Sequence, residues 1–95
     1  MTARTAHVPL SEALAKGPPP PGNLAVPIFA HGSLAAELYT PQDEDLQQPH
    51  DRDEIYVVAR GIGVFFDGET RRPVQPGTFL FAPAGRPHHF EDFTA

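Results

Sequence analysis

Four side chains of the kinds that bind metal ions occur in two separate stretches of this sequence. Gln48, His50 and Glu54 lie close together, and His88 follows much later in the chain. Successive side chains of a β-strand point to opposite faces, so the first three, all at even positions, would face the same side of a continuous strand. Two imidazoles, one carboxylate and one amide oxygen suit Fe(II), Mn(II), Ni(II) or Zn(II) rather than a thiolate-seeking metal. The residues therefore predict a divalent metal site without specifying the element.

The elements that would position these side chains are short β-strands. Pro49 and the charged residues 51–53 are typical of a strand end or a turn, so strict alternation need not hold around His50. Asp67-Gly68 and Pro76-Gly77 are strong turn signals. Many short strands with no helix between them predict an antiparallel sandwich or barrel. The expected strands are 24–29, 33–40, 54–60, 64–66, 70–75, 78–82 and 88–90.

The beginning of the chain differs from the rest in composition. Ser11 is expected to cap a one-turn helix over 12–16, which Gly17 would end. The run Pro18–Pro21 predicts an extended, polyproline-type arm, because proline fits neither a helix interior nor a central strand. We therefore expect an N-terminal tail with a Pro-rich arm over residues 1–22 and a β-barrel domain over residues 23–95.

Length and charge narrow the class of protein. Ninety-five residues make one small domain, near the size at which oligomerisation often adds the missing buried surface. Asp plus Glu number 12 and Lys plus Arg number 7, for a net charge of -5, which argues against nucleic acid as a partner. The chain has no cysteine and no long apolar stretch, so a cytoplasmic protein without a membrane span is expected.

Two motifs in the sequence resemble those of the cupin superfamily. The stretch from Gln48 to Glu54, followed by Gly61, is similar to the first cupin motif, in which two histidines flank one residue and a glutamate and a glycine follow. The second motif is matched in order and spacing, and the resemblance covers roughly residues 33–92. Its residues are Gly77, Pro83, Gly85 and His88.

The resemblance implies an all-β fold, a small antiparallel, jelly-roll-like β-barrel with a divalent metal inside. His50, Glu54 and His88 take the positions of family ligands, whereas Gln48 stands where the first histidine usually is. Glutamine offers only a neutral carbonyl oxygen, so Gln48 would either bind weakly or position a water. Cupins usually carry further strands after the position of Ala95, so either a partner's strand or an open edge is expected, and a homodimer is predicted.

The sequence also predicts the surroundings of several aromatic, histidine and acidic residues. Tyr56 shares strand parity with Glu54, and Phe90 with His88, so both are expected to line the pocket. Phe79 and Phe81 share one strand face and are assigned to the core. His89 is expected to point away from the metal, and the acidic run 43–45 to form a solvated loop.

The fold by itself leaves function open, because one barrel serves many chemistries. The first hypothesis is a metal-dependent dioxygenase or isomerase acting on a small organic metabolite. The alternative is a non-catalytic module that binds or senses a small-molecule ligand in the same pocket. A third interpretation, in which Gln48 marks a vestigial site, predicts no metal at all. Whether the chain is an enzyme is not decided by its sequence.

Overall fold

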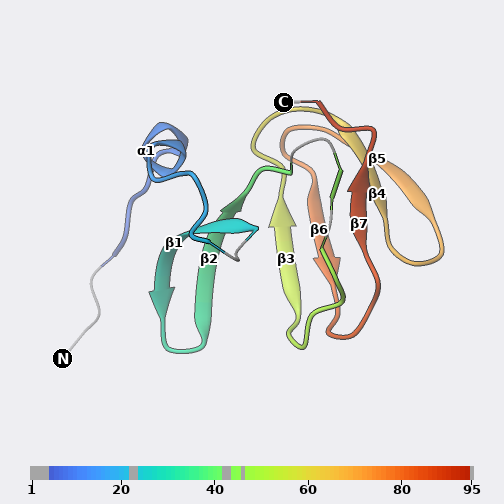
Figure 1. Cartoon of the computed structure of the whole chain (residues 1–95), viewed down its shortest axis with the longest axis horizontal. Helices are drawn as coiled ribbons and strands as arrows, with labels where there is room; N and C mark the ends of the chain where they lie inside the picture. The colour runs from blue at the N-terminus through green and yellow to red at the C-terminus, as the bar shows by residue number, and fades with distance from the viewer. Residues whose placement is uncertain (1–4, 22–23, 42–43, 46, 95) are drawn as a thin grey trace. The chain divides into compact units, whose positions relative to one another are not determined.

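The computed structural model describes residues 5–21, 24–41, 44–45 and 47–94. The chain divides into two compact units, residues 1–40 and 41–95, whereas the sequence-based boundary at residues 22/23 stays a prediction. Among the described residues no helix is long and apolar enough to cross a bilayer. The elements labelled in Figure 1 are α1 (Leu10–Ala15), β1 (Ala25–His31), β2 (Leu34–Tyr39), β3 (Glu54–Val57), β4 (Gly63–Phe66), β5 (Arg71–Val74), β6 (Phe79–Ala82) and β7 (His89–Glu91).

The first unit holds α1 and the β1–β2 hairpin. The helix starts after Pro9, and Ser11 lies inside it without a capping hydrogen bond, so the predicted cap is wrong. Pro9 occupies the cap position instead, because the fixed φ of proline suits the start of a helix. Strand β1 pairs with β2 alone, and its register shifts between Pro27 and Phe29, where proline cannot donate to the ladder. Residues 18–21 are in neither helix nor strand, and their polyproline-type conformation stays a prediction.

The second unit consists of two antiparallel sheets. β3 pairs with β6, and a three-stranded sheet has the order β5-β4-β7. Each predicted strand of this unit is present, and the all-β antiparallel architecture is confirmed. β3 ends at Val57, earlier than expected, before Gly61 reverses the chain with a left-handed φ of 83°.

The hydrophobic core of the second unit lies between its two sheets. Phe65 on β4, Val74 on β5 and Ala82 on β6 are buried. Side chains from both sheets surround them, so the core holds the two sheets together. The partly buried residues packed against it are Tyr56, Val58, Leu80 and Phe90.

The other side of the β3–β6 sheet is apolar and exposed. Pairing sets Ile55 opposite Phe81 and Val57 opposite Phe79, and these four side chains, here called the β3–β6 apolar face, are 55–65% exposed. Phe79 and Phe81 share a strand face as predicted, but their assignment to the core is wrong. The inward positions of β6 belong to Leu80 and Ala82, because neighbouring residues on a strand point to opposite sides.

The turn from β4 to β5 depends on Asp67. Its carboxylate accepts hydrogen bonds from the backbone N–H groups of Thr70 (2.7 Å) and Glu69 (2.9 Å) and from the Thr70 hydroxyl (2.9 Å). These bonds, with a smaller contribution from the Arg86 guanidinium, lower the pKa of Asp67 from an ordinary value near 3.8 to about 2.

Acid should therefore weaken this turn. A carboxylate with a lowered pKa stabilises the fold fully above about pH 4, and this contribution is lost as the pH falls through about 2. We expect the melting temperature of Asp67→Asn to lie below that of the wild type at pH 6 and the difference to shrink between pH 4 and pH 2. Thermal unfolding followed by circular dichroism measures both curves. Glu12→Gln, in the first turn of α1, is the control. A constant difference across this pH range would contradict the role of Asp67.

Candidate metal centre

Three of the predicted ligands come together in the second unit. His50 lies in the loop before β3, Glu54 is the first residue of β3, and His88 directly precedes β7. Glu54 Oε1 is 3.1 Å from His88 Nε2 and 3.3 Å from His50 Nε2. One potential ligand atom of each residue lies within 4.8 Å of the others. The two sequence motifs therefore meet at one point, although binding of a metal there stays a prediction.

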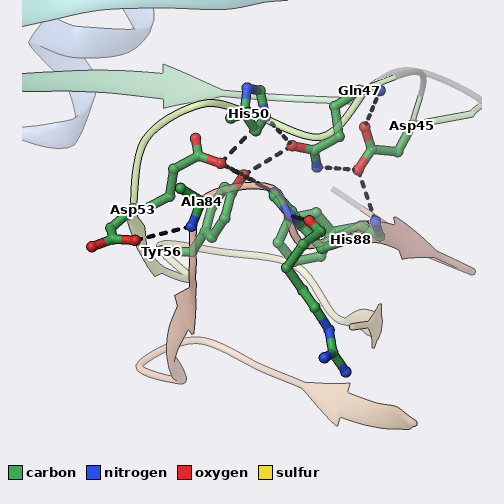
Figure 2. A network of polar contacts seen from close by, with 10 residues as sticks. Asp45, Gln47, His50, Asp53, Tyr56, Ala84 and His88 are labelled. Carbon is green, nitrogen blue, oxygen red and sulfur yellow. Dashed lines mark hydrogen bonds and ion pairs between the residues drawn. The ribbon is translucent and has the colours of Figure 1, made fainter. Parts of the chain in front are cut away.

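Two backbone contacts hold the motif loops against each other. The Gly85 N–H donates to the carbonyl oxygen of His50 at 2.6 Å. The Ala84 N–H donates to Asp53 Oδ1 at 2.9 Å, as Figure 2 shows. Gly85 has a φ of +79°, in the left-handed region that residues with a side chain rarely adopt. The motif glycine thus shapes the turn that fixes the position of His50 relative to His88.

The hydrogen bonds of His88 determine which ring nitrogen faces the cluster as an acceptor. His88 Nδ1 lies 2.8 Å from the carbonyl oxygen of Arg86. Because a carbonyl oxygen only accepts, Nδ1 carries the hydrogen, and the neutral ring has its lone pair on Nε2. That lone pair faces Glu54 Oε1, and the His88 side chain is only 2% exposed. Two acceptors this close, one of them on a buried imidazole, are stabilised by a shared hydrogen or a bound cation, and a cation site presents this arrangement.

The Tyr56 hydroxyl lies among the same acceptors (Figure 2). It is 2.9 Å from Gln47 Oε1, 3.1 Å from His88 Nε2 and 3.3 Å from Glu54 Oε1. Burial, and after it the Glu54 carboxylate, raises the pKa of Tyr56 above its ordinary value. The hydroxyl therefore stays protonated at neutral pH, but its single hydrogen serves only one of the three acceptors at a time.

Glutamine at the site is Gln47, which the sequence did not single out. The Gln48 side chain is exposed, whereas Gln47 Oε1 lies 3.2 Å from His50 Nε2. Strand alternation, which placed Gln48 with His50, does not apply because residues 47–53 are outside any strand. Pro49 and the charged residues 51–53 were the hints of this irregularity. Coordination by Gln48 is untested and stays a prediction.

Asp45 was also missed, because the acidic run 43–45 was expected to be solvated. Asp43 lies outside the described residues, but Asp45 is only 8% exposed. Its carboxylate accepts from the backbone N–H of Phe90 at 2.7 Å, from the backbone N–H of Gln47 at 3.1 Å and from Gln47 Nε2 at 2.6 Å. Asp45 therefore ties the segment before His50 to β7.

The spacing of the cluster fits a divalent cation. Ligand atoms about 2.1 Å from a cation and at right angles to each other are about 3 Å apart. The separations of Glu54 Oε1 from the two histidines, 3.1 and 3.3 Å, are close to this value. A mixed nitrogen and oxygen set of this kind suits Fe(II), Mn(II), Ni(II) or Zn(II).

A hollow of about 140 Å³ adjoins the cluster. His88 belongs to both, so a molecule in the hollow would lie beside the candidate metal ligands. Tyr56 and Phe90 are not in its wall; their rings pack against each other and against Phe65, and a pocket-lining role for them stays a prediction. The wall is formed by Phe65, Asp67, Phe81, Ala82, Pro83, Arg86 and His88.

The remaining histidines do not join the cluster. His89 Nε2 lies 2.9 Å from Glu91 Oε2, and the His89 ring packs against the ring of Phe66. The Arg71 guanidinium lies over the same Phe66 ring. His89 thus points away from His88, as expected for the next residue along a strand. His7 and His31 are exposed.

The second unit is an antiparallel β-domain, and two histidines and a glutamate meet beside its core. These features place the chain in the class of small β-barrel proteins with a candidate metal centre. The family model described as "Cupin domain" matches residues 36–92, more than half of the chain. The chain therefore belongs to the cupin family, and the resemblance inferred from its two motifs is confirmed. No curated protein and no solved structure shows a significant match to it.

Proposed function

We propose that this cupin binds one divalent cation, Fe, Mn, Ni or Zn, through His50, Glu54 and His88. The observation that carries the proposal is the approach of three side chains that can each offer a ligand atom, with the Nε2 atoms of His50 and His88 3.3 and 3.1 Å from the same Glu54 oxygen. His88 presents the Nε2 lone pair 3.1 Å from Glu54 Oε1, in a place where the imidazole is buried. Burial of the His88 imidazole limits the access of water to its Nε2, so a bound cation is the natural partner.

The same site is proposed to act on a small organic metabolite. The hollow beside His88 has room for only a small molecule, and its wall includes the apolar residues Phe65 and Ala82 together with Arg86. When bound, the cation would supply a Lewis acid next to a substrate oxygen. The Tyr56 hydroxyl, kept protonated, would donate a hydrogen bond to one of the groups around the cation. These features are compatible with a metal-dependent dioxygenase or isomerase.

One observation favours the alternative, a module that binds or senses a small ligand without turning it over. Asp67 is the one carboxylate in the wall of the hollow, and its pKa of about 2 makes it a poor base. Its oxygens are also occupied by the β4–β5 turn. Oxygen consumption or product formation by the metal-loaded protein with candidate metabolites would support the enzyme. Saturable ligand binding without product would support the module.

A homodimer is part of the proposal. The β3–β6 apolar face holds two cross-strand pairs of large apolar side chains, each more than half exposed. Large apolar side chains gathered on one exposed sheet face are typical of an association site. A second copy would present the same flat sheet face, which suits two-fold pairing.

Elemental analysis of the purified protein tests metal binding. We expect about one equivalent of metal in the wild type and a large loss in Glu54→Ala, because the substitution removes the only anionic oxygen of the set. Glu37→Ala, which removes an exposed carboxylate on β2, is the control and should keep its metal. A wild type that takes up none of the four metals after incubation with each would refute the proposal and leave the site vestigial.

A further inference from the structure

The side-chain oxygen of Gln47 lies close enough to the candidate metal centre to act as a ligand. Its Oε1 lies 3.2 Å from His50 Nε2 and 2.9 Å from the Tyr56 hydroxyl. The first separation is close to the roughly 3 Å expected between adjacent ligands of one cation. A carbonyl oxygen has two lone pairs, so accepting from Tyr56 leaves one pair available. The amide oxygen thus lies where a fourth ligand is needed.

The orientation of the Gln47 amide is fixed by Asp45. The two ends of a glutamine amide are nearly alike in shape, so partners alone decide which end faces a site. Gln47 Nε2 lies 2.6 Å from Asp45 Oδ2, and a carboxylate only accepts. The NH₂ group must therefore face Asp45, and the oxygen must face His50 and Tyr56. Figure 2 shows Asp45 and Gln47 side by side at the edge of the cluster.

Asp45 is itself held in place. Its Oδ2 accepts from the backbone N–H of Phe90 at 2.7 Å, and its Oδ1 accepts from the backbone N–H of Gln47 at 3.1 Å. Phe90 follows His88 by two residues, so the carboxylate links Gln47 to the strand next to a metal ligand. Asp45 is also largely buried, which limits competition from water.

We propose that Gln47 supplies the fourth ligand of the cation through its side-chain oxygen and that Asp45 is the positioning residue that turns this oxygen toward the site. This inference rests on the proposed metal binding by His50, Glu54 and His88. It assigns to Gln47 the role that the motif spacing gave to Gln48. A neutral oxygen in this position makes the site one of two imidazoles, one carboxylate and one amide, which retains the borderline donor set suited to first-row divalent metals.

Metal titration of matched leucine variants separates the two glutamines. Gln47→Leu keeps the approximate size of the side chain and removes its oxygen, so we expect the dissociation constant for Co(II) to rise by about 10- to 100-fold. Gln48→Leu removes an exposed amide and should leave the constant unchanged. The Co(II) absorption spectrum, which reports the ligand set, should change in Gln47→Leu only. Unchanged binding and spectrum in Gln47→Leu, or losses confined to Gln48→Leu, would overturn the assignment.

A double-mutant cycle tests whether Asp45 acts by positioning Gln47. In Asp45→Asn the residue at position 45 donates as well as accepts, so the Gln47 amide is no longer held in one orientation, and affinity should fall. Because Asp45 acts through Gln47, adding Asp45→Asn to Gln47→Leu should cause no further loss of affinity. Additive losses would contradict the positioning role. Failure of the wild type to bind Co(II) would instead refute metal binding itself, which keeps the two proposals distinguishable.

Discussion

His88→Ala should abolish metal binding and also lower the free energy of unfolding by about 2 to 4 kcal/mol. Metal affinity should fall at least 100-fold or so, since even residues that only support a ligand contribute about 10- to 100-fold. The loss of stability follows from burial. The His88 side chain is 2% exposed, and its ring packs against Tyr56 and Phe65. Alanine would leave a cavity there and an unpaired carbonyl oxygen on Arg86.

Two further variants separate the ligand role of His88 from its structural role. His88→Asn fills more of the cavity, so it should recover part of the stability without recovering metal affinity. His89→Ala removes the adjacent histidine, which pairs with Glu91 on the other side of the strand, and should bind metal normally while costing at most about 1 kcal/mol. Chemical denaturation of the metal-free proteins gives the stabilities, and metal titration gives the affinities. Wild-type affinity in His88→Asn would show that His88 is not a ligand.

The sequence was sufficient to predict which three candidate ligands the structure brings together. His50, Glu54 and His88 belong to motifs whose glycines and prolines also encode the turns around them. Gly85 is an example, because its left-handed φ and its N–H contact with His50 fix the distance between the two motifs. Residue type and backbone conformation are coupled at such positions, so a local pattern carried long-range information.

Gln47 and Asp45 could not be predicted because they lie outside regular structure. In a strand, parity assigns each side chain to a face, and on that basis Gln48 was grouped with His50. The chain before β3 follows no such period, and the adjacent residue Gln47 faces the cluster instead. The burial of Asp45 depends on a hydrogen bond to Phe90, forty-five residues later. A contact of that kind depends on the tertiary structure, and no local pattern specifies it.

The sequence also could not predict which side of β6 faces solvent. Residues 79–82 are apolar throughout, so their alternation gives no signal about which face is inward. The structure buries Ala82, partly buries Leu80 and leaves Phe79 and Phe81 exposed. Such a strand is expected where both faces are covered in the assembled protein. The exposure of Phe79 and Phe81 therefore favours association with another chain.

Phe79→Lys should therefore convert the proposed homodimer into a monomer. Phe79 is 61% exposed and pairs with Val57 across β3 and β6, so the lysine is tolerated in the separate chain. In a two-fold dimer the substitution occurs on both copies, and each aromatic anchor lost from an interface costs about 2 kcal/mol or more. The dimer dissociation constant should rise by about 30-fold at least. Sedimentation velocity over a range of concentrations measures it.

Leu34→Lys is the matched control, because Leu34 is 59% exposed and lies on β2 in the other compact unit. It places the same charge at a similarly exposed apolar position that is not part of the β3–β6 apolar face. Both variants should keep the circular dichroism spectrum and melting temperature of the separate chain. A wild type that stays monomeric at all concentrations would refute the dimer. Dissociation by Leu34→Lys but not by Phe79→Lys would place the interface elsewhere. Loss of the dimer in Phe79→Lys alone would assign the exposed phenylalanines of β6 to a subunit interface and explain why an apolar strand turns them outward.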